Sequence, residues 1–84
     1  MYKIEIYTKN YCPYCTHAKD LLRIKGIDFV EYDVTVDVAK EQEMRDRSNR
    51  KTVPEIFIAD QLVGGCSDLF DLDERGELDH LLEP

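Results

Sequence analysis

The stretch Tyr11-Cys12-Pro13-Tyr14-Cys15-Thr16 joins a strand-like run to a helix-like run near the start of the chain. Pro13 suits the first position of a helix, where its missing N–H costs nothing, so Cys12 lies where that helix begins. Its sulfur then faces backbone N–H groups that have no partner within the helix, and such groups favour the thiolate. The pattern predicts Cys12 as a nucleophile. Cys15, one turn further and partly buried, is predicted as the thiol that resolves its disulfides.

The runs on either side of this stretch predict a βαβ unit. Residue types alternate over 2–8, which predicts a strand with Ile4 and Ile6 on one face and Glu5 and Tyr7 on the other. Apolar residues at helical spacing predict a helix over 13–25, ended by Gly26. Strand-favouring residues return over 28–34. We therefore expect two parallel strands joined by a right-handed crossover.

A second helix is expected from an Asp37 cap to about Ser48, with Asn49 ending it in a left-handed conformation. Few of its residues are apolar, so most of its surface is expected to be solvated. The spacing of its charges predicts two ion pairs on the exposed side, Glu41 with Arg45 and Glu43 with Arg47.

The remainder of the chain predicts a hairpin and a third helix. Short strands over 55–59 and 62–64 flank a turn, which indicates an antiparallel pair. The helix that follows is expected to be capped by Cys66 or Ser67 and ended by Gly76, with a last amphipathic turn over 78–82. The predicted order is βαβαββα.

Size and charge exclude several classes of function. The 84 residues are expected to form one domain, 1–84. A net charge of −7 argues against binding to nucleic acid or to an anionic membrane. No apolar stretch is long enough for a secretory signal or a membrane span, so a cytoplasmic protein is expected.

The cysteines allow a redox or a metal-binding interpretation. Three cysteines, an odd number, do not make a disulfide scaffold. A structural zinc site usually takes four ligands, and the remaining candidates Cys66, His17 and His80 form no second paired motif. No metal site is therefore predicted, and the βαβ context favours redox chemistry.

Two later stretches have the character of a peptide-binding site. Pro54 belongs at the start of a strand and can hold a cis bond there, which would leave the Val53 backbone free to pair with an extended peptide. The turn Gly64-Gly65-Cys66-Ser67-Asp68 enters a helix, whose N–H groups can bind a carboxylate while Asp68 faces an ammonium. Taken singly, these stretches are better explained as an ordinary turn and an ordinary helix cap.

In combination, these motifs resemble the dithiol (class I) glutaredoxins, most of all the short bacterial glutaredoxin 3 type. The resemblance implies an α/β, thioredoxin-like fold with a four-stranded mixed sheet flanked by helices on both faces. The matching stretches cover almost the whole chain: Glu5-Ile6-Tyr7-Thr8-Lys9, Cys12-Pro13-Tyr14-Cys15, Thr52-Val53-Pro54 with Ile56-Phe57-Ile58, and Gly64-Gly65-Cys66-Ser67-Asp68-Leu69.

The resemblance implies glutathione as the ligand of these motifs. Glutathione is an anionic tripeptide, and a small basic patch on this acidic chain would suit it. The implied contacts fall into four groups: Lys9 and Tyr14 at the sulfur end, Thr52, Val53 and Pro54 along the cysteine of the ligand, Gly65, Cys66, Ser67 and Asp68 at its γ-glutamyl end, and Arg50 and Lys51 as further cations.

One residue departs from the family pattern. The second helix of glutaredoxins often supplies Gln, Arg or Lys to the glycine carboxylate of glutathione, eleven residues before the Thr of Thr-Val-Pro. Glu41 stands at that position here and carries the wrong charge. Either Gln42, Arg45 or the Arg50-Lys51 pair substitutes, for which we favour Arg50-Lys51, or glutathione binds more weakly than is typical.

The implied activity is glutathione-dependent thiol–disulfide exchange. Cys12 takes glutathione from a glutathionylated protein or small disulfide, and a second glutathione regenerates it; with protein disulfides Cys12 attacks first and Cys15 resolves. No bound cofactor or metal is implied. Glutathione is the cosubstrate, and NADPH enters through a separate glutathione reductase. The implied partners are glutathione and glutathionylated or disulfide-containing proteins, with ribonucleotide reductase as one candidate, and we expect a monomer.

Two other functions fit parts of the pattern. A dedicated electron donor to ribonucleotide reductase, reduced by thioredoxin reductase, would share the fold, but the turn 65–68 argues against it. An iron–sulfur carrier would ligate a cluster through Cys12 between two subunits. Cys15 and Pro13 argue against a carrier, because relatives used in that way commonly have Ser at the second position and Pro13 stiffens the turn.

Overall fold

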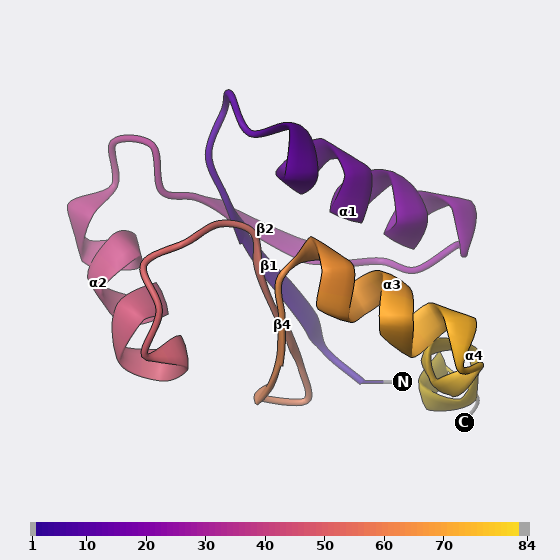
Figure 1. The fold of residues 1–84 in the computed structure, drawn as a ribbon. Helices are drawn as coiled ribbons and strands as arrows, with labels where there is room; N and C mark the ends of the chain where they lie inside the picture. The colour runs from indigo at the N-terminus through magenta and orange to yellow at the C-terminus, as the bar shows by residue number, and fades with distance from the viewer. Residues whose placement is uncertain (1, 83–84) are drawn as a thin grey trace.

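A four-stranded mixed sheet forms the centre of the molecule, in the order β2-β1-β3-β4. The computed structural model describes residues 2–82. Strand β1 runs parallel to β2 and antiparallel to β3, and β3 and β4 form the predicted hairpin. Figure 1 shows α1 and α3 on one side of the sheet and α2 on the other. The elements are β1 (Ile4–Thr8), α1 (Pro13–Ile24), β2 (Val30–Asp33), α2 (Val38–Ser48), β3 (Glu55–Ile58), β4 (Gln61–Gly64), α3 (Cys66–Glu74) and α4 (Glu77–Leu82).

Alternation along β1 divides the core into two clusters, as predicted. Ile4 and Ile6 pack with the apolar residues of α1, α3 and α4, among them Leu22 and Leu69. Tyr7 packs on the other face with residues that include Met44 of α2. Both faces of the sheet are therefore covered by helices, and the predicted thioredoxin-like architecture is confirmed. The C-terminal turn forms a separate helix, α4, which the predicted order lacks.

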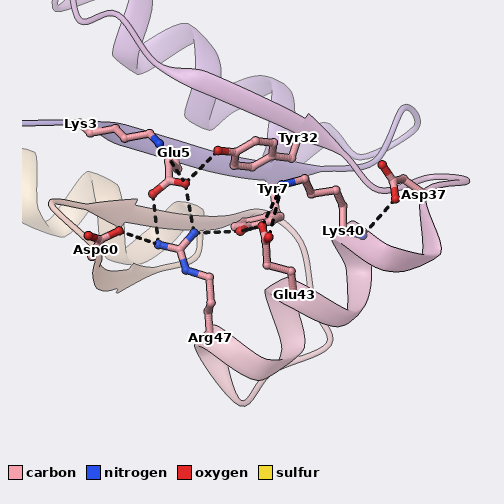
Figure 2. A network of polar contacts seen from close by, with 9 residues as sticks. All are labelled: Lys3, Glu5, Tyr7, Tyr32, Asp37, Lys40, Glu43, Arg47 and Asp60. Atoms are coloured by element: carbon pink, nitrogen blue, oxygen red, sulfur yellow. Dashed lines mark hydrogen bonds and ion pairs between the residues drawn. The ribbon is translucent and has the colours of Figure 1, made fainter.

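Helix α2 is held to the sheet mainly by polar contacts. Figure 2 shows Arg47 reaching from α2 to Glu5, with nitrogen–oxygen distances of 3.1 and 3.2 Å, and donating to the Tyr7 hydroxyl at 2.8 Å. The Arg47 guanidinium also lies 4.0 Å from the centre of the Phe57 ring. Burial by itself would raise the pKa of Glu5, but hydrogen bonds from Arg47 and Tyr32 hold it below its ordinary value.

These contacts correct one predicted ion pair. Glu41 and Arg45 do pair, at 3.6 Å. The predicted pair between Glu43 and Arg47 is wrong, because Arg47 turns inward to the buried carboxylate of Glu5. Glu43 instead accepts hydrogen bonds from Tyr7 and Lys40.

The ends of α2 and α3 follow local chemistry. Asp37 caps α2 by accepting from the Lys40 N–H at 3.0 Å, and Asn49 ends it in the left-handed region with φ 57°, as predicted. The prediction that Cys66 or Ser67 caps α3 is wrong. The cap is Gly65, whose N–H donates to the Asp68 carboxylate at 2.9 Å, so Cys66 is the first helical residue.

Candidate active site

Cys12 is the N-cap residue of α1 and is half-buried. Its sulfur accepts a hydrogen bond from the Cys15 N–H at 3.3 Å, and it lies 3.7 Å from the Val53 carbonyl oxygen, to which the thiol donates. A backbone donor at a helix start stabilises a thiolate. The predicted position of Cys12 at the beginning of the helix is confirmed.

Cys15 lies one turn further along α1 and is only 1% exposed. Burial raises the pKa of its thiol to about 12, and the hydrogen bond with Cys12 acts in the same direction. At neutral pH, Cys15 is therefore a protonated thiol shielded from solvent. The two sulfurs therefore occupy different environments. Cys12 can attack a disulfide of a bound substrate, whereas Cys15 can attack only a disulfide formed on Cys12.

A groove of about 300 Å³ adjoins the dithiol. It brings together segments that are far apart in the sequence: the start of α1, the loop before β3 and the start of α3. A Cβ atom at Gly65 would lie 3.5 Å from the Pro54 carbonyl oxygen, so the two loops lie close together. The Val53–Pro54 peptide bond is cis. The lining residues were all predicted as ligand contacts: Tyr14, Thr52, Val53, Pro54, Gly65, Cys66 and Ser67.

The predicted cations lie beside this groove and do not line it. Arg50 and Lys51 line a neighbouring hollow of about 600 Å³ that shares Thr52 with the groove. Arg45, one of the alternative cations that the sequence offered, and Asn49, which was not predicted as a site residue, complete its lining. The spacing of four residues between Arg45 and Asn49 at the end of α2 could have indicated this, because it places both side chains on one helix face.

Lys9 is paired with the residue that departs from the family pattern. Its amino group lies 3.3 Å from the Glu41 carboxylate, and both side chains are 26% exposed. The other oxygen of Glu41 pairs with Arg45. Glu41 thus offsets part of the positive charge of two cations, Lys9 and Arg45.

Asp68 lies at the start of α3, where it accepts from the Gly65 N–H. Arg50 approaches both Asp68 and the buried Glu55, with nitrogen–oxygen distances of 3.8 Å to each. Sequence reasoning missed Glu55. The only feature of the sequence that could have indicated its role is a charged residue at a strand position next to Pro54.

Cys66 contributes to the groove but is a poor nucleophile. Burial raises the pKa of its thiol, and the nearby Cys12 raises it further. Within residues 2–82, no group of three or more His, Cys, Asp or Glu side chains is arranged to hold a metal ion. No helix in that range is long and apolar enough to cross a membrane.

A half-buried and a fully buried thiol at the start of one helix, on a mixed sheet with helices on both faces, define a thiol–disulfide oxidoreductase of the thioredoxin-like fold. The sequence profile of the glutaredoxin family matches residues 4–63. The chain belongs to the glutaredoxin family, and it is a glutathione-dependent thiol–disulfide oxidoreductase.

Known relatives agree with this assignment. Glutaredoxin 3 of Escherichia coli K12 is 54% identical over 83 residues, covering 99% of this chain and 100% of that protein. A solution structure of glutaredoxin from Brucella melitensis is 48% identical, with a TM-score of 0.84, over 98% of this chain and 89% of that one. A crystal structure of a buckwheat glutaredoxin–glutathione complex has a TM-score of 0.87 over 96% of this chain and 76% of that one; at 24% identity it supports the fold alone.

Proposed function

We propose that Cys12 and Cys15 divide the reaction between them as nucleophile and resolving thiol. The Cys12 thiolate attacks the glutathione sulfur of a mixed disulfide, and the released protein sulfur takes up a proton. The thiolate of a second glutathione then attacks the glutathione sulfur on Cys12, releasing glutathione disulfide and the Cys12 thiolate. With a protein disulfide, Cys12 forms the mixed disulfide and Cys15 displaces the protein. Two glutathiones reduce the resulting Cys12–Cys15 disulfide.

The groove supplies the proposed glutathione site, and its position beside Cys12 is the observation that carries the proposal. The cysteine of glutathione pairs with the Val53 backbone, between Thr52 and Pro54. Its γ-glutamyl carboxylate meets the N–H groups of Cys66 and Ser67 at the start of α3, next to Gly65, and its ammonium meets Asp68. The membership of the chain in the glutaredoxin family supports the choice of ligand.

The remaining contacts are assigned from charge. Tyr14 lines the sulfur end, together with Lys9. Arg50 and Lys51 remain the proposed cations for the glycine carboxylate, and their place in the hollow next to Thr52 supports this. Glu41 weakens the glycine end of the site because it pairs with Arg45, which lines the same hollow as Arg50 and Lys51.

We further propose that residues 1–84 act as one monomeric, cytoplasmic domain without a bound cofactor, supplied with electrons from NADPH through a separate glutathione reductase. Disulfide-containing proteins such as ribonucleotide reductase are proposed as substrates beside glutathionylated ones.

A coupled assay tests the electron source. The protein, a glutathione mixed disulfide, glutathione, glutathione reductase and NADPH should give steady NADPH oxidation. Thioredoxin reductase and NADPH without glutathione should not. Turnover in the second mixture alone would assign the protein to the thioredoxin reductase-dependent donors.

A further inference from the structure

Glu55 is a buried carboxylate that has no part in the scheme above. It is the first residue of β3, directly after Pro54, and 0% of it is exposed. One oxygen, Oε2, accepts from the Thr52 hydroxyl at 2.9 Å. The other, Oε1, has no hydrogen-bond donor among residues 2–82. A buried acceptor without a donor is uncommon and costs stability, so it points to a role outside folding.

The cation nearest to Oε1 is Arg50, which is placed between two carboxylates. Its Nη1 lies 3.8 Å from Glu55 Oε1 and 3.8 Å from Asp68 Oδ2. Both distances exceed those of a hydrogen bond, so Arg50 is held by charge without being fixed to either carboxylate. Its side chain is 50% exposed, which leaves the guanidinium free to move towards one partner or the other.

Asp68 is the carboxylate assigned above to the ammonium of the γ-glutamyl group. Its side chain is 46% exposed. If Arg50 closed onto Asp68, the guanidinium would stand where that ammonium binds and would neutralise the charge that attracts it. The attraction of Arg50 to the buried Glu55 opposes this movement.

We propose that Glu55 is a positioning residue for the ammonium of the ligand: its buried carboxylate holds Arg50 back from Asp68, so that Asp68 stays available to the γ-glutamyl group. The inference rests on the proposed role of Asp68. It gives Arg50 a resting position between two acids.

Acidification should act through the same residue. Burial raises the pKa of Glu55, and the charged groups that face it are Arg50, which lowers this pKa, and Asp68, which raises it. Protonated Glu55 no longer attracts Arg50, so Arg50 moves to Asp68. The γ-glutamyl ammonium of the ligand then no longer binds to Asp68. The KM for a glutathione mixed disulfide should therefore rise as pH falls.

The test is a double-mutant cycle of Glu55→Gln and Arg50→Met. The substrate is the mixed disulfide of glutathione with 2-mercaptoethanol, and KM and kcat are measured at neutral pH. Glu55→Gln should raise KM about two- to five-fold, the range expected for a half-exposed ion pair, and leave kcat unchanged. When Arg50→Met is already present, adding Glu55→Gln should have no effect on KM. Glu74→Gln, which makes the same charge change at an exposed position on α3, is the control.

A second probe separates this inference from the function on which it rests. The same mixed disulfide made with des-amino glutathione lacks the ammonium, so Glu55→Gln should leave its KM unchanged. If the wild type does not discriminate between the two substrates, Asp68 has no ammonium role and the proposed site is wrong at this end. If the wild type does discriminate, two outcomes would show that Glu55 does not position Arg50. In the first, Glu55→Gln raises KM equally in the wild type and in the Arg50→Met background. In the second, Glu55→Gln raises KM in neither background. The pH dependence of the wild-type KM tests the inference without a mutation. A KM that stays constant on acidification contradicts it.

Discussion

Cys12 and Cys15 are close together in sequence, yet the fold gives them opposite surroundings. Cys12 is half-buried at the start of α1, while Cys15 is enclosed one turn below it. The spacing of the pair and the placing of Pro13 were enough to predict this arrangement. The spacing could not show that the Cys12 thiol would reach the Val53 carbonyl oxygen, which belongs to a distant loop of the chain.

The buried thiol of Cys15 should make stability depend on pH in the alkaline range. Its pKa is raised from 9.0 to about 12 in the folded protein, so the unfolded chain loses this proton first as pH rises. The contribution to the free energy of unfolding is therefore complete below about pH 9 and is lost between pH 9 and 12. Urea unfolding at several pH values should show a steeper alkaline decline for the reduced wild type than for Cys15→Ser. Equal declines would contradict the burial of this thiol.

Glu41 should limit the affinity for the glycine end of glutathione. Glu41→Gln releases Lys9 and Arg45, so the KM for a glutathione mixed disulfide should fall by about two- to five-fold. The mixed disulfide of γ-glutamylcysteine, which lacks the glycine, should show a smaller change. Steady-state kinetics with both substrates measures the difference. An unchanged KM for both would show that Glu41 does not face the ligand.

Helix α2 depends on Arg47 in a way that its sequence does not reveal. The pattern of its residues predicted a solvated helix, and Val38 is indeed exposed. The same pattern placed Arg47 on the exposed side, because residue spacing within one helix gives no information about a buried acid on a neighbouring strand. The partner, Glu5, lies forty-two positions away in the chain.

Removing Arg47 should therefore destabilise the fold strongly. Arg47→Met leaves the Glu5 carboxylate buried without its cation, at a cost of about 3 kcal/mol in the free energy of unfolding. Glu5→Gln in the same chain should recover part of that loss. Arg23→Met is the matched control, because its pair with Asp20 is exposed and contributes little. Chemical denaturation of these variants and the wild type measures the energies, and similar losses for Arg47→Met and Arg23→Met would contradict the account.

The turn from β4 into α3 needs glycine at position 64. Gly64 has φ +123°, and a Cβ there would overlap the Asp68 carboxylate. Gly64→Ala should displace Asp68, which raises the KM for glutathione substrates and lowers stability. Gly26→Ala is the control: it has φ +71° but nothing within 4 Å of the added carbon, so it should lower stability without changing KM. Kinetics combined with thermal unfolding separates the two effects, and an unchanged KM in Gly64→Ala would remove Asp68 from the site.

At the scale of the whole molecule, the site is an assembly of three segments, each of which was ambiguous in sequence. The strand and helix periods, with their caps, predicted the order of the elements, except for the cap at Gly65 and the separate helix α4, and the family resemblance implied the four-stranded mixed sheet. The motifs predicted the groove residues, because the family resemblance implies that these separate motifs bind the same ligand, glutathione. The positions of the charges could not be predicted, since Lys9, Arg47 and Arg50 each pair with acids from other elements.

The net charge of −7 is therefore not spread evenly around the site. Arg45, Arg50 and Lys51 gather at the hollow beside Thr52, where Glu41 and Glu55 offset only part of the charge of Arg45 and Arg50. An acidic protein can in this way present a basic surface to an anionic peptide.

The division of labour between the two cysteines is the central claim, and two serine variants test it most directly. Wild type, Cys12→Ser and Cys15→Ser are compared on a glutathionylated protein and on a protein disulfide, with glutathione as reductant. Cys12→Ser should be inactive on both substrates, while Cys15→Ser should keep deglutathionylation and lose reduction of the protein disulfide. Equal loss of both activities in the two variants would contradict the account.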